Sequence, residues 1–86
     1  MDTIKGIEGI SPRVVDVIPE QDYTLLVTFN NGQKRRYNVR NLFDLPIYKD
    51  LKKVFMAASV KYGTVVWPGD IDISPDTLYL SGDKVL

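Results

Sequence analysis

The chain has 86 residues, of which 44% are hydrophobic, and its 11 basic and 11 acidic side chains give a formal net charge of zero. This length supports one domain with a small core. The sequence contains no cysteine and no histidine, which excludes disulfides, thiolate metal ligands and imidazole catalysis and argues against an enzyme. The charge is uneven: residues 34–61 carry eight basic and two acidic side chains, and the segments on both sides are acidic.

Residues 1–11 have two glycines and no hydrophobic period, so we expect a flexible leader followed by a single α+β domain over residues 12–86. No apolar run reaches the ~18–20 residues of a membrane span. The beginning of the chain also lacks the pattern of a secretory signal. A cytoplasmic protein of bacterial type, without membrane association, is therefore expected.

The first half of the domain predicts a three-stranded antiparallel meander. Val and Ile residues between Pro12 and Pro19 indicate a short strand. Residues 23–29 alternate apolar and polar side chains and indicate a second strand. A two-residue loop would pair basic side chains with the apolar face, whereas a three-residue loop over residues 30–32 pairs Leu25 with Tyr37. We favour the second register because it keeps one face apolar.

The second half predicts a helix, a second short hairpin and a short C-terminal helix. Residues 45–58 have apolar side chains at helical spacing, which predicts an amphipathic helix lying across the sheet, with Asp44 as its cap. Residues 58–67 predict a hairpin with its turn at Tyr62 and Gly63, and residues 67–70 (WPGD) predict a type II turn. Ser74 followed by Pro75 predicts the start of the last helix.

Three aspartates, Asp70, Asp72 and Asp76, lie within seven positions. The stretch resembles the first half of a calcium-binding loop, but Pro75 stands where that loop requires glycine, and Ser81 stands where it requires glutamate. In an extended stretch Asp70 and Asp72 would simply face solvent. We therefore expect no metal, no cofactor and no catalytic residue here, and a polar edge that can contact a protein partner.

Two further features admit a functional and a structural interpretation. Lys34, Arg35, Arg36 and Arg40 surround an aromatic residue in the basic hairpin (residues 33–40), which is typical of a nucleic-acid surface but also of an edge strand protected by charge. This basic strand can instead meet the acidic segment WPGDIDIS (residues 67–74), within one chain or between the two copies of a homodimer. Trp67, the single tryptophan, is either a partner-binding anchor or a core residue, and we favour the core.

The segments PRVVDVIP, DYTLLVTFNNGQKRRY, LPIYKDL and WPGDIDISPDTLY resemble a bacterial family known as domain of unknown function 2442. The most specific positions are in the last segment: Trp67, Pro68, Gly69, Asp72, Pro75, Leu78 and Tyr79. The resemblance implies a small α+β fold with a meandering sheet, and no activity. It further implies an accessory or regulatory module, because some relatives are fused to a helix-turn-helix domain or encoded beside another small protein.

Two hypotheses follow from the sequence. The first is a non-catalytic protein-interaction module that uses Trp67, Asp70 and Asp72. The alternative is a nucleic-acid-binding accessory protein that uses Lys34, Arg35, Arg36 and Arg40.

Overall fold

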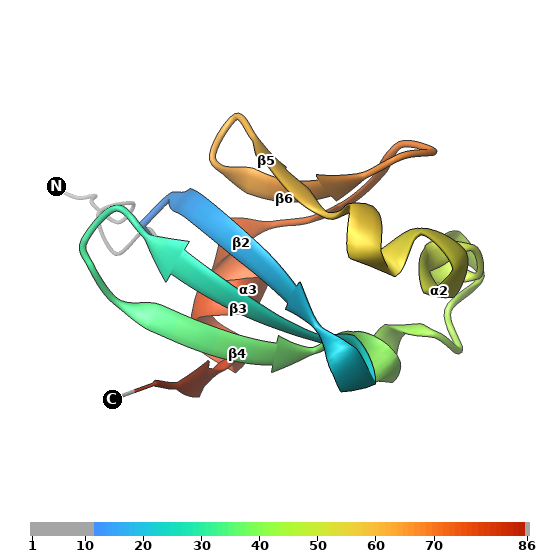
Figure 1. Ribbon diagram of the computed structural model, residues 1–86, viewed down its shortest axis with the longest axis horizontal. Coiled ribbons are helices and arrows are strands. Elements are labelled where there is room, and N and C mark those ends of the chain that lie inside the picture. Colours follow the sequence, from blue (N-terminus) through green and yellow to red (C-terminus); the bar gives the residue numbers. More distant parts are fainter. Residues whose placement is uncertain (1–11, 86) are drawn as a thin grey trace, which may run out of the picture.

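The computed structural model describes residues 12–85, so the predicted leader over residues 1–11 lies outside the described residues. The fold is α+β, as predicted: a four-stranded antiparallel sheet and a three-stranded antiparallel sheet, with short helical segments (Figure 1). Buried side chains from both sheets form one hydrophobic cluster. The two sheets therefore share a core.

The four-stranded sheet contains the predicted meander. Its strands are ordered β2-β3-β4-β8, with bounds Val14–Glu20, Thr24–Phe29, Lys34–Asn38 and Asp83–Lys84. Leu25 pairs with Tyr37, and Gly32 has a φ of +85°. The three-residue loop and its register are thus confirmed, and glycine supplies the left-handed residue that such a loop needs.

Alternation along β3 and β4 explains how this sheet is covered. Leu25, Val27 and Phe29 are buried and face the side on which α3 (Pro75–Ser81) lies behind β3 and β4 (Figure 1). The ring of Phe29 meets that of Tyr79 on α3 edge to face, with centroids 5.0 Å apart. Burying these apolar side chains is the main stabilising contribution of the meander.

The second sheet has the order β5-β6-β7, with bounds Ser59–Lys61, Thr64–Trp67 and Ile71–Ile73. The hairpin with its turn at residues 62–63 is confirmed. The strand β7 was predicted only as an extended stretch. The two sheets meet where the Val14 amide donates to the Gly63 carbonyl (2.9 Å) and the Arg13 guanidinium donates to the Tyr62 carbonyl. We call this contact the β2–β5 joint.

The prediction of one amphipathic helix over residues 45–58 is wrong in its length. The segment forms a single α-helical turn, α2 (Leu51–Val54), between 3-10 turns at Pro46–Tyr48 and Phe55–Ala57. The Phe55 carbonyl accepts a hydrogen bond from the indole of Trp67 (2.8 Å) instead of continuing an α-helix. Ile47, one of the apolar side chains at helical spacing on which this prediction rested, is 74% exposed. Leu45, and not Asp44, is the N-cap of the turn at Pro46–Tyr48.

Two more 3-10 turns flank strands of the meander: Gln21–Tyr23 connects β2 to β3, and Val39–Leu42 follows β4. Among the described residues, no helix is long and apolar enough to cross a membrane.

The start of α3 is as predicted, and it supplies a first testable prediction. The Ser74 hydroxyl accepts a hydrogen bond from the Thr77 amide (3.3 Å), and Pro75 occupies the first turn. Ser74→Ala should lower the free energy of unfolding by about 1 kcal/mol, because one amide at the helix start loses its partner. Urea unfolding measures this loss, and a Ser74→Asp variant should retain most of the stability. Equal stability of the alanine variant and the parent would contradict the capping role.

Candidate functional site

The acidic turn is defined as residues 68–72, which comprise the loop between β6 and β7 and the first two residues of β7. Trp67 pairs with Ile71 across it. Gly69 has a φ of +93°, as a type II turn requires at this position. Asp70 also has a positive φ, of 61°, a conformation that costs energy for most side chains and that Asp and Asn tolerate best. The turn therefore fixes the direction in which the Asp70 side chain leaves the backbone.

Trp67 fixes the base of the acidic turn from inside the molecule. It is 3% exposed, its indole N–H donates to the Phe55 carbonyl, and its ring is stacked on that of Phe55 with centroids 6.4 Å apart. The structure thus agrees with the core interpretation. Because the ring is covered, Trp67 can support a binding surface but presents almost no surface of its own.

A hollow of about 360 Å³ lies beside the acidic turn. Asp70 and Asp72 are exposed, and the Asp72 carbonyl accepts a hydrogen bond from the Tyr48 hydroxyl (3.4 Å). The ion pairs found within residues 12–85 involve neither of these aspartates. The lining residues are Lys61, Val66, Trp67, Pro68, Gly69, Asp70, Ile71 and Asp72. Lys61 reaches this region from β5, and Tyr48 reaches it from 24 residues before Asp72.

Arg36 and Arg40 in the basic hairpin have acidic partners. The Arg36 guanidinium donates to both carboxylate oxygens of Glu20 (3.0 and 3.3 Å). This hydrogen bonding and the charge of Glu20 raise the pKa of Arg36 above its usual value. Arg40 lies 3.8 Å from the Asp22 carboxylate, and both of these side chains are largely exposed. Such pairs on a protein surface contribute little stability, but they reduce the positive potential available to a phosphate backbone.

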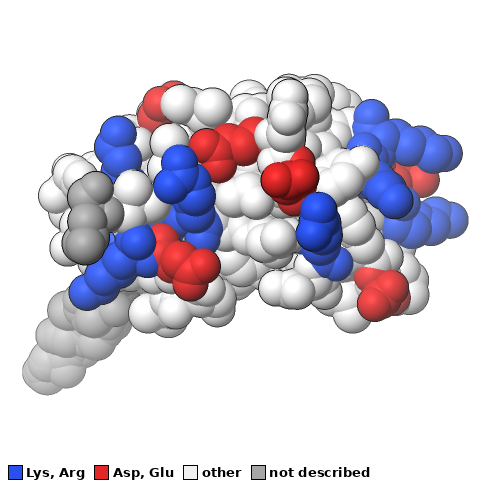
Figure 2. All heavy atoms as spheres, turned by 60° about the horizontal axis from the view of Figure 1, so that its bottom comes forward, with Lys and Arg blue, Asp and Glu red and all other residues white. Residues whose placement is uncertain are grey.

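Arg35 lies on the face of β4 opposite to Lys34 and Arg36. It is only 5% exposed. Its guanidinium lies 4.2 Å from the centre of the Tyr79 ring. Of the four basic side chains proposed from the sequence, Lys34 alone is exposed and without an ion pair among residues 12–85. The four therefore do not form one surface. Figure 2 shows blue and red side chains next to each other over much of one face, with Lys and Arg gathered at the α2 end.

No grouping of three or more acidic side chains that could hold a metal ion occurs within the described part of the chain. Asp76 lies in the first turn of α3, where a negative charge is favourable, so it belongs to the helix start and not to the acidic turn.

Comparison with known proteins identifies a family. The sequence model of a family described as "Protein of unknown function (DUF2442)" matches residues 14–83. Neither a curated protein nor a solved structure matches this chain.

Proposed function

Because the chain belongs to the DUF2442 family, whose function is unknown, we propose from its own surface that it is a non-catalytic interaction module which binds a protein partner through the acidic turn. In this proposal the partner presents a basic side chain to Asp70 and Asp72. The module serves an accessory or regulatory role, in the cytoplasm of a bacterial cell.

The observation that carries this proposal is the combination of a buried anchor and a free acidic tip. Trp67 fixes the base of the turn through the Phe55 carbonyl, whereas Asp70 is exposed and has a positive φ. Strained backbone that the surrounding structure holds in place is common at functional sites. A turn whose backbone is already held in place also loses little conformational freedom when its carboxylate pairs with a cation.

The nucleic-acid alternative has weaker support. The pairing of Arg36 with Glu20 and of Arg40 with Asp22 lowers the positive charge of the hairpin, and Arg35 is covered. A protein that binds nucleic acid needs several free cations for its phosphate contacts. Within the basic hairpin, Lys34 is the only cation that is both exposed and without an ion pair among residues 12–85.

The experiment that tests the proposal is a pull-down from native extract with the tagged parent and the Asp70→Asn variant. Asparagine keeps the shape of the side chain and tolerates a positive φ, so stability should change by no more than about 0.5 kcal/mol. Recovery of the partner should fall about tenfold, because a charge-assisted hydrogen bond is lost.

Asp44→Asn is the matched control, since Asp44 is exposed and lies outside the acidic turn, and this variant should recover the partner like the parent. The extract is run with and without nuclease. Recovery that is unchanged in Asp70→Asn would refute the role of the turn. Recovery that disappears after nuclease treatment would favour the nucleic-acid alternative instead.

A further inference from the structure

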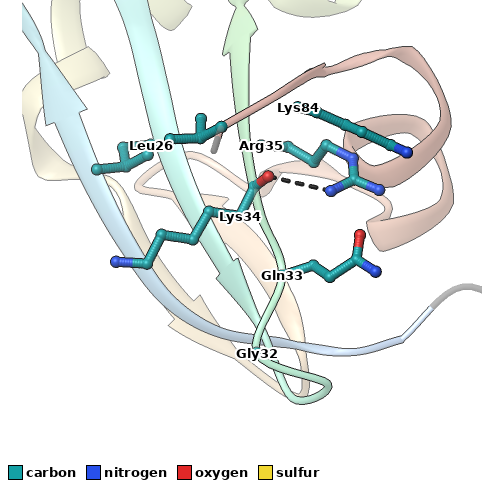
Figure 3. A pocket seen from close by; sticks show the side chains of 7 residues that line it. Leu26, Gly32, Gln33, Lys34, Arg35 and Lys84 are labelled. Atoms are coloured by element: carbon teal, nitrogen blue, oxygen red, sulfur yellow. Dashed lines mark hydrogen bonds between the residues drawn. The ribbon is translucent and has the colours of Figure 1, made fainter.

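A second hollow, of about 620 Å³, lies beside β4 and the edge strand β8 of the four-stranded sheet. Three of its lining side chains are cationic and none is acidic. The full lining is Leu26, Gly32, Gln33, Lys34, Arg35, Lys84 and Val85. Figure 3 shows the side chains of Gln33, Arg35 and Lys84 extending to one side of β4, whereas Lys34 and Leu26 lie on the other side. We call the first group, Gln33, Arg35 and Lys84, the cationic edge.

The charge of Arg35 is buried without a carboxylate partner in the described residues. Its Nε donates to the Tyr79 carbonyl (3.2 Å) and its Nη1 donates to the Lys34 carbonyl (3.0 Å). These carbonyls accept hydrogen bonds from the Arg35 guanidinium, but they carry no net charge that would neutralise it. A charged side chain that is 95% removed from solvent is normally paired with an opposite charge. Neither ion pair found within residues 12–85 includes Arg35.

Lys84 adds a second positive charge directly beside Arg35. The two residues are paired across β4 and β8, so their side chains are on the same face of the sheet. Like charges at such paired positions repel and destabilise a sheet. The Gln33 side chain is on the same side and brings an amide donor. The cationic edge thus combines a buried guanidinium, an exposed ammonium group and an amide.

We propose that the cationic edge is a binding site for a single oxyanion, the charge class shared by a phosphate group and a carboxylate. The guanidinium is held in place by the Tyr79 ring and two carbonyls, and Lys84 closes on the anion from β8. A bound anion offsets the repulsion between the two cations and compensates the buried charge. The site is remote from the acidic turn and does not depend on the proposed function.

The test is an NMR titration of the ¹⁵N-labelled chain with inorganic phosphate, and separately with acetate, at constant pH and ionic strength. Saturable shifts are expected at the Arg35 Nε–H and at the amides of Gln33 and Lys84. Lys84→Gln should weaken binding about tenfold, because one charge-assisted contact is removed. Lys53→Gln, an exposed cation on α2, is the matched control and should leave binding unchanged.

The outcomes separate clearly. Saturation by phosphate but not by acetate would support the site and assign it to a phosphate group, and the reverse would support it for a carboxylate. The proposal is overturned if neither anion saturates, if the shifts spread equally over the α2 lysines, or if Lys84→Gln binds like the parent. Lys84 is exposed, so the Lys84→Gln variant is expected to remain folded. Its NMR spectrum without added anion checks this.

Discussion

Trp67→Ala should lower the free energy of unfolding by about 3–5 kcal/mol, the range for removing a large aromatic side chain from a core. The indole is buried, stacked on Phe55, and donates to the Phe55 carbonyl. Its removal leaves a cavity between β6 and the segment that follows α2. It also leaves the Phe55 carbonyl without its indole donor. A chain of this size has a total stability of only ~4–13 kcal/mol, so this loss is a large fraction of the total.

Urea unfolding followed by far-UV circular dichroism measures this effect without relying on tryptophan fluorescence. Trp67→Phe should lose less, because it retains most of the packing and loses the hydrogen bond. Ile47→Ala is the control, since Ile47 is 74% exposed and should change stability by no more than about 0.5 kcal/mol. A loss below about 1 kcal/mol in Trp67→Ala would show that the indole is not the anchor of the acidic turn.

Gly82→Ala should destabilise the fold by about 1–3 kcal/mol through overpacking. Gly82 has a φ of −80°, so its backbone conformation is open to any residue and glycine is required for space alone. An added Cβ would lie 2.5 Å from the Leu78 carbonyl oxygen and 3.0 Å from the Cβ of Arg35. The first of these contacts is with backbone, which cannot move aside without shifting the end of α3 or the start of β8.

The expected local result is a loosening of β8 from β4. Hydrogen exchange of the Val85 amide, which donates to the Lys34 carbonyl (3.3 Å), should become faster than in the parent. Ser81→Ala is the matched control, because Ser81 is the exposed neighbour of Gly82. If Gly82→Ala and Ser81→Ala were equally stable, the close approach between α3 and β4 would have to be relaxed in solution.

The meander could be predicted because local rules determine it. Alternation placed Leu25 and Tyr37 on one face, and the need to keep that face apolar selected the three-residue loop that the structure contains. The Ser74 cap and the second hairpin also depend on residues close together in the chain.

The elements that were missed depend on contacts between distant segments. The helix predicted over residues 45–58 is interrupted at Val54, whose φ and ψ are −113° and 7°, and Phe55 is engaged by Trp67, twelve residues further on. The strand β8 has two residues and exists only because β4 provides its partner. Neither contact leaves a periodic signal in the sequence.

For the candidate sites, the sequence showed where charged residues gather but not which residues they contact. Parity alone places Arg35 on the face of Tyr37, opposite Lys34 and Arg36, which already divides the basic hairpin in two. The partners Glu20 and Tyr79, by contrast, lie 16 and 44 residues away. The exposure of Asp70 and Asp72 follows from the alternation of the sequence, whereas the anchoring of their turn became apparent only with the indole hydrogen bond.

The β2–β5 joint has a consequence for the order in which the chain folds. Each of the two sheets contains a meander whose neighbouring strands follow one another in sequence, so these contacts form at a small cost in chain entropy. The joint instead connects Arg13 with Tyr62, 49 residues apart. Contacts of long sequence separation slow folding. We therefore expect the two meanders to form early and their docking at the joint to be the step that limits the folding rate.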